Sequence, residues 1–164
     1  MTWENASLEE AKSWLRDNLD QGANCPCCTQ KARIYKRQIN SSMAYVLILL
    51  DRYFRESTDE WLHVPSYLTG LGLNPRLSAA FRGDWAKLKY WGFLEEKPDV
   101  RDDGSPHAGF HRITPAGIQF VRGETRVLKY MHIYNNHVLH QSGPPTSIQD
   151  ALGQKFSYNE LMKG

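Results

Sequence analysis

The order of short segments between Ser41 and Gly123 constrains the fold of this chain more than any other feature. Pro65 lies at the start of one helical segment, Gly92 at the end of another and Pro115 at the start of a third. Apolar spacing between these breaks predicts, in order, a helix over 41–55, a strand over 61–64, helices over 65–69 and 77–91, a strand over 93–97, a polar loop over 99–109, a strand over 110–114 and a helix over 115–123. The predicted fold class is α+β.

Two segments of this stretch resemble the winged-helix (winged helix-turn-helix) family. Trp91-Gly92-Phe93-Leu94-Glu95-Glu96 is similar to the exit from a recognition helix into the wing, and Phe110-His-Arg-Ile-Thr-Pro-Ala-Gly117 is similar to the strand that returns from it. The resemblance covers about residues 41–123 and implies a winged-helix core. Small winged-helix proteins of bacteriophages and prophages look similar, with a cysteine turn in front.

The remaining sequence predicts a part on each side of residues 41–123. Residues 1–40 hold a helix over 7–20 that begins at the capping box Ser7-Leu-Glu-Glu10, then a cysteine-rich turn and a basic strand over 31–39. Residues 124–164 hold a β-hairpin that turns at Asn135-Asn136, followed by a tail with one short helix over 147–152 and apolar residues over 155–162. The segment 142–145 is expected to break the chain. The first helix and the tail are the candidates for packing or for a homodimer contact.

The winged-helix resemblance implies DNA binding, with the third helix in the major groove and the wing on the DNA backbone. The residues that would contact double-stranded DNA lie on the helix, the loop and the return strand of this region. They are Arg82, Lys87, Lys89, Arg101, His107 and Arg112.

The formal net charge of +2 is unevenly distributed along the chain. Residues 23–50 contain no acid and carry Lys31, Arg33, Lys36 and Arg37, a block that could meet a polyanion. Residues 76–112 hold seven bases against six acids, which is a small excess for a surface that neutralises several phosphates. A basic stripe joining 31–37 to the third helix would favour DNA binding, whereas a solvated mixed surface would favour protein contacts.

The three cysteines lie together in Cys25-Pro26-Cys27-Cys28. The odd number and the strain of a bond between adjacent cysteines argue against a disulfide framework. Cys25 and Cys28 have the spacing of a zinc-binding pair, and the turn resembles half of a zinc ribbon, with Thr29 where a glycine usually stands. The other ligands would come from histidines such as His132 and His137, from carboxylates or from a second chain. A reduced cluster without metal is the alternative.

No nucleotide-binding, metalloprotease or serine-hydrolase motif occurs in the sequence, so we predict no enzyme. A Cys–His nucleophile is the enzymatic alternative. The longest apolar run, 44–50, is too short to cross a membrane, and the acidic start does not resemble a signal peptide, so a cytoplasmic protein without a membrane partner is expected.

The function predicted from the sequence is that of a DNA-binding winged-helix protein, either a transcriptional regulator or a phage DNA-associated factor. The alternative is a winged-helix module that binds another protein, such as a phage factor acting on host machinery, without binding DNA. Zinc is the one cofactor that the sequence suggests.

Overall fold

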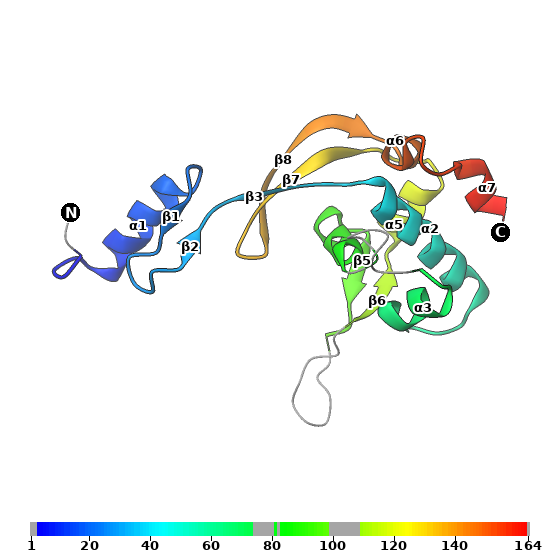
Figure 1. The fold of residues 1–164 in the computed structure, drawn as a ribbon, viewed down its shortest axis with the longest axis horizontal. Coiled ribbons are helices and arrows are strands. Elements are labelled where there is room, and N and C mark those ends of the chain that lie inside the picture. The colour runs from blue at the N-terminus through cyan, green and yellow to red at the C-terminus, as the bar shows by residue number, and fades with distance from the viewer. Residues whose placement is uncertain (1–2, 74–80, 82, 99–108, 164) are drawn as a thin grey trace, which may run out of the picture.

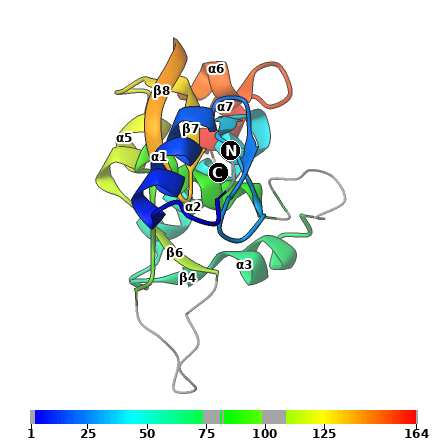
Figure 2. The same ribbon diagram turned by 90° about the vertical axis from the view of Figure 1, so that its left-hand side faces the viewer.

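The computed structural model describes residues 3–73, 81, 83–98 and 109–163, and its fold is α+β, as predicted from the sequence. Figure 1 shows a body with most of the helices and an N-terminal unit that projects from it; this unit is defined here as residues 3–32. Figure 2 views the molecule from the side of this unit. Strand β3 (Tyr35–Gln38) connects the unit to the body.

Helix α2 (Ser41–Glu56) lies at the centre of the body. Between Ser42 and Asp51 every residue except Tyr45 is buried, and the apolar ones belong to one hydrophobic core that includes residues of both three-stranded sheets. The apolar residues fall on all sides of this segment, which explains why it is packed by other elements all round. The helix predicted over 41–55 is confirmed.

The residue that caps α2 differs from the prediction. Asn40, rather than one of the two serines that follow it, is the N-cap, and its side-chain oxygen accepts a hydrogen bond from the N–H of Met43 at 2.9 Å. Asparagine and serine cap helices about equally well. The helix begins one residue earlier than a serine cap would allow, so both serines are already helical.

A small antiparallel sheet packs beside α2. Its strands are β4 (Leu62–His63), β5 (Leu94–Glu96) and β6 (Phe110–Ile113), in the order β4-β6-β5. Helix α3 (Val64–Gly70) follows β4, and helix α5 (Pro115–Val121) follows β6. Gly117 in α5 permits a close approach, because a Cβ there would lie 2.6 Å from the carbonyl oxygen of Phe93. These elements agree with the predicted strands and short helices.

The helix predicted over 77–91 is present over Asp84–Trp91 in the described part of the chain, but with 3-10 and not α-helical geometry. Asp84–Trp91 is the 3-10 helix η1, and it begins after Gly83, whose φ of 149° interrupts helical geometry. Its buried residues are Trp85, Leu88 and Trp91, which are spaced by three, the repeat of a 3-10 helix. Residues 74–80 and 82 lie outside the described part of the chain.

A larger antiparallel sheet lies on the other side of the core and has the order β3-β7-β8. Strand β7 (Val127–Tyr134) pairs with both neighbours, and β8 (His137–Thr146) is an edge strand. The turn at Asn135 and Asn136 is confirmed, with φ values of 50° and 64°.

The predicted break at 142–145 is wrong, because β8 continues to Thr146. Pro144 and Pro145 are tolerated there since an edge strand needs no backbone donor on its outer side. Gly143 has a φ of 90°, and a Cβ at this position would overlap the ring of Tyr130. The close approach of this ring to the strand therefore requires glycine.

The N-terminal unit contains helix α1 (Leu8–Asn18) and the short strands β1 (Ala23–Asn24) and β2 (Lys31–Ala32). The predicted helix and its capping box are confirmed. The single strand predicted over 31–39 is instead two strands, because β2 pairs with β1 inside the unit whereas β3 pairs with β7 in the body.

The tail packs on the body through helix α6 (Ile148–Leu152) and helix α7 (Tyr158–Lys163). The ring of Phe156 lies 4.7 Å from that of Tyr45, and the hydroxyl of Tyr158 donates to the carbonyl of Val121 at 2.7 Å. Among the described helices, none combines the length and the apolar character needed to span a bilayer.

Candidate functional site

The larger sheet is built entirely from sequence without acids. No Asp or Glu lies between Asp20 and Asp51 or between Glu124 and Asp150, and these two intervals contain β3, β7 and β8. The strands carry the cations Lys36, Arg37 and Lys129. Because no strand of this sheet supplies a carboxylate, the charges of these cations are not cancelled within the sheet.

Tyr35, at the start of β3, holds two arginines in place. The Cζ atom of Arg33 lies 4.6 Å from the centre of the Tyr35 ring, and that of Arg37 lies 5.1 Å from it. Tyr35 is 41% exposed, so this group is at the surface. A cation–π contact orients a guanidinium without neutralising it, so both arginines keep their positive charge for a ligand.

Arg37 and Lys87 line one hollow between β3 and η1, which we call the β3–η1 hollow. It measures about 410 Å³ and is lined by Tyr35, Arg37, Lys87, Tyr90, Ile133, Asn135 and Asn136. The hydroxyl of Tyr90 donates to the side-chain oxygen of Asn136 at 3.2 Å, which connects the hairpin turn to η1. Two cations predicted from separate parts of the sequence thus lie on one surface.

The opposite face of the sheet carries Lys36 and two histidines. The Nζ atom of Lys36 lies 4.1 Å from the centre of the Tyr130 ring, and Lys36 is paired in register with His132. His132 stacks on His140 with 3.9 Å between ring centres, and its Nε2 is 2.7 Å from the hydroxyl of Ser142. Burial, followed by the charges of His140 and Lys36, lowers the pKa of His132. The neutral form of its ring is therefore favoured.

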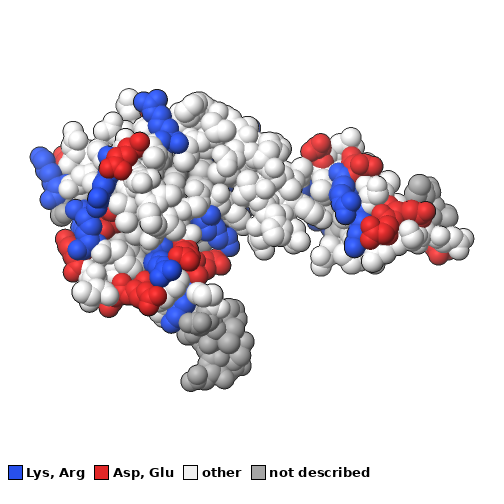
Figure 3. Space-filling view, turned by 180° about the vertical axis from the view of Figure 1, so that it is seen from behind, with Lys and Arg blue, Asp and Glu red and all other residues white. Residues whose placement is uncertain are grey.

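The predicted DNA-contacting cations of η1 and β6, including Lys87 of the β3–η1 hollow, are engaged with carboxylates. Lys87 lies 2.7 Å from Asp84 and Lys89 lies 2.9 Å from Glu96, and the hydrogen bond from Lys89 is the main cause of the lowered pKa of Glu96. Figure 3 shows such cations and acids side by side on the body, seen from behind.

Arg112 is similarly engaged. It contacts Glu95 at 2.8 Å and Glu60 at 3.2 Å, and its guanidinium lies over the ring of Trp61. A phosphate would compete with two carboxylates for this side chain. The remaining predicted contacts, Arg82, Arg101 and His107, lie outside the described residues.

The cysteine turn connects β1 to β2 and is closed by backbone hydrogen bonds. The N–H of Cys25 donates to the carbonyl of Gln30 at 2.8 Å, and the N–H of Thr29 donates to the carbonyl of Cys25 at 2.9 Å. Thr29 has a φ of 62°, the left-handed conformation that favours glycine. The backbone N–H of Cys28 and then that of Cys27 lower the pKa of the Cys25 thiol, so the turn stabilises a thiolate there.

The structure places Cys25 and Cys28 beside the end of the hairpin but does not group them with the predicted histidines. Both cysteines line a hollow of about 280 Å³ together with Tyr134 and Asn135. His132 is engaged with His140 and Ser142, and His137 is exposed opposite Tyr134. Within the described ranges, no three His, Cys, Asp or Glu side chains are close enough to hold a metal together.

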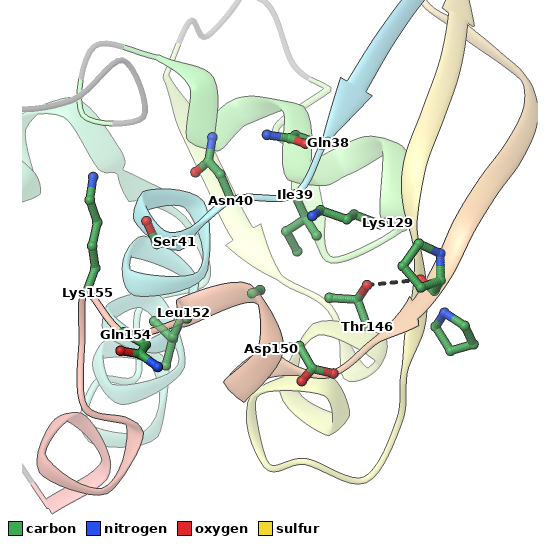
Figure 4. A pocket seen from close by; sticks show the side chains of 14 residues that line it. Gln38, Ile39, Asn40, Ser41, Lys129, Thr146, Asp150, Leu152, Gln154 and Lys155 are labelled. Carbon is green, nitrogen blue, oxygen red and sulfur yellow. Dashed lines mark hydrogen bonds between the residues drawn. The ribbon is translucent and has the colours of Figure 1, made fainter.

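Another hollow lies between the start of α2 and the tail (Figure 4). Its volume is about 510 Å³, and its lining includes Asn40, Lys129, Asp150 and Lys155. The pKa of Asp150 is lowered, chiefly by the backbone N–H of Ser147, so its carboxylate is present together with the two lysines. The lining is of mixed charge, unlike that of the β3–η1 hollow.

Sequence reasoning missed the contribution of Lys129 to the basic sheet. The absence of acids from 125–149 was a usable signal, since it marks the same charge pattern as 23–50. No local signal could have revealed that Tyr90 and Asn136, 46 residues apart, would connect η1 to the hairpin. Comparison with known protein families, with curated proteins and with solved structures found no match.

Proposed function

We propose that this chain is a DNA-binding protein of winged-helix type that contacts the phosphates of double-stranded DNA through β3 and the adjoining η1. The observation that carries the proposal is the β3–η1 hollow, where Arg37 and Lys87 lie on one surface. The hollow brings the basic strand next to this helix, so that a phosphate could contact Arg37 directly and Lys87 in competition with Asp84.

The order of elements supports the winged-helix assignment of residues 41–123. Helix α2, strand β4, helix α3, η1 and the β5–β6 pair follow one another, and the returning strand β6 lies between β4 and β5. The sharp turn out of η1 is made by Gly92 in the left-handed conformation, with a φ of 77°. In winged-helix proteins the corresponding elements present a helix and a wing on one side of the domain.

The ion pairs of the body suggest that the cations around β3 contribute more to phosphate binding than the cations of η1 and β6. Lys89 and Arg112 are held by Glu96 and by Glu95 with Glu60, so a phosphate gains less from meeting them. Arg33 and Arg37 instead rest on a neutral ring. We therefore assign most of the electrostatic affinity to β3.

The test is a binding titration on random-sequence duplex DNA at several salt concentrations. The double variant Arg33→Ala/Arg37→Ala should bind more weakly at every salt concentration. Its slope of log affinity against log salt should fall by about 2, because each lost phosphate contact removes about 0.9 from that slope. The matched control is Lys12→Ala/Arg16→Ala, which removes the same charge from α1 and should leave the slope unchanged.

Equal losses in the two double variants would show that only total charge matters and would contradict the assignment to β3. Absence of binding at low salt would contradict DNA binding itself. The carboxylates around Lys89 and Arg112 favour the alternative in that case, a module that binds another protein through a surface of mixed charge.

A further inference from the structure

The N-terminal unit has very little hydrophobic core. Among its described residues only Ala11 and Leu19 are buried apolar side chains, and neither belongs to the core of the body. Leu8 is 59% exposed, and Trp3 and Trp14 contact each other edge to face beside a surface hollow. A unit below about 40 residues usually needs a disulfide, a metal or a second chain to hold its fold.

The cysteine turn of this unit offers two thiols with the spacing of a zinc-binding pair. All three cysteines are free, so no disulfide takes the place of the missing core. Cys25 and Cys28 line the same hollow, whereas Cys27 does not line it. Thr29 is held in the left-handed conformation, which favours glycine.

The number of ligands is incomplete within one chain. Zinc in a structural site takes four ligands in a tetrahedron, and Cys25 with Cys28 provides two. No third His, Cys, Asp or Glu joins them among the described residues. A second copy of the same turn, related by a twofold axis, would supply the same two sulfurs and complete the tetrahedron.

The exposed apolar side chains indicate that the partner is a second copy that packs at this end of the molecule. Five large apolar side chains are exposed among the described residues, and four of them belong to the N-terminal unit, to β3 or to the end of the hairpin. These four are Leu8, Tyr35, Val138 and Leu139. Tyr35 and the hairpin residues Tyr134 and Asn135 also line the hollow of Cys25 and Cys28.

We propose that Cys25 and Cys28 from two copies of the chain hold one zinc ion and thereby form a symmetric dimer. The zinc ion stabilises the fold of each N-terminal unit, which has little hydrophobic core of its own. Each thiol that binds releases its proton to solvent, and no electron is transferred. Neither cysteine lines the β3–η1 hollow, although Tyr35 and Asn135 line both hollows. Zinc content and native mass are measured without DNA, so a failure of DNA binding would not decide this proposal.

The experiment measures zinc content and native mass on the full chain after equilibration with zinc. One zinc per two chains and the mass of a dimer are expected, and a chelator should convert the dimer to monomers. Cys25→Ser and Cys28→Ser should each lose the zinc and the dimer, while the matched variant Cys27→Ser should keep both. Replacement of zinc by Co²⁺ should give the absorption bands of a tetrahedral thiolate site.

Three outcomes would overturn the proposal. One is a monomer with one zinc, and another is a chain that takes up no zinc. The third is a dimer that survives zinc removal unchanged. The variant His132→Ala/His137→Ala separates the ligand sources, because loss of its zinc would place the other ligands on the hairpin of the same chain. If a cysteine variant fails to fold, the stoichiometry of the unchanged chain still decides.

Discussion

The ring of His111 lies on β6 with its edge against Trp85, at 4.8 Å between ring centres, and only 4% of the residue is exposed. The nearest carboxylate oxygen, on Glu96, is 3.7 Å from Nε2, too far for a hydrogen bond. Glu96 in turn pairs with Lys89. Burial is the main cause that lowers the pKa of His111, so the folded protein keeps this ring neutral where an unfolded chain would protonate it.

This residue predicts how stability depends on pH. An unfolded histidine titrates near pH 6.5 and folded His111 below it, so the unfolded chain gains its proton first as the pH falls. Above pH 6.5 His111 therefore does not reduce the free energy of unfolding. As the pH falls from 6.5 to the pKa of the folded protein, the free energy of unfolding decreases. Urea unfolding at pH 7.5 and 5.5 should show a smaller pH-dependent loss in His111→Phe than in the unchanged protein. An equal loss of unfolding free energy in both proteins would contradict the prediction. The variant should still lose some stability at pH 5.5, because the pKa of His132 is also lowered.

At the scale of elements, α2 gives a test of which residue begins it. Asn40→Ala removes the cap of Met43 N–H and should lower the free energy of unfolding by about 1 kcal/mol. Ser41→Ala changes the neighbouring residue inside the helix and should shift it by less than about 0.5 kcal/mol. Denaturant titrations of the two variants check this. A larger loss of unfolding free energy in Ser41→Ala than in Asn40→Ala would show that the serine predicted from the sequence is the N-cap.

The elements that the sequence predicted well are those specified by local signals. The capping box of α1, the apolar pattern of α2 and the Asn135-Asn136 turn act within a few residues, and all three are present in the structure. The 3-10 helix was missed because the spacing of Trp85, Leu88 and Trp91 fits one side of an α-helix nearly as well. The continuation of β8 was missed because a strand tolerates proline only at an edge, and which strand is the edge depends on the whole sheet.

The candidate site was predictable only as separate pieces. The basic block Lys31–Arg37 was visible in the sequence, but its meeting with Lys87 depends on how β3 and η1 pack, about 50 residues apart. The carboxylate partner of Lys89 depends on how η1 packs against β5, and Glu95 reaches Arg112 through the pairing of β5 with β6, so a local pattern reveals neither.

At the scale of the molecule, the core lies entirely in the body. Every residue of the hydrophobic core is at position 39 or beyond, and only Arg33 and Ile34 separate β2 from β3. A fragment of residues 34–164 should therefore unfold in one cooperative transition with a melting temperature within about 4 °C of the full chain, a shift worth no more than about 1 kcal/mol. Calorimetry of the two proteins tests this, and a broad or strongly lowered transition would show that the N-terminal unit stabilises the body.

The two prolines at the end of β8 have a further consequence for the molecule in a crowded cell. An edge strand offers unpaired backbone groups that can recruit a strand from another molecule and start an aggregate. Pro144 and Pro145 have no N–H to offer, and Gly143 turns the backbone into a conformation that a regular strand does not adopt. The outer edge of the larger sheet therefore ends in residues that resist such fibre-like growth.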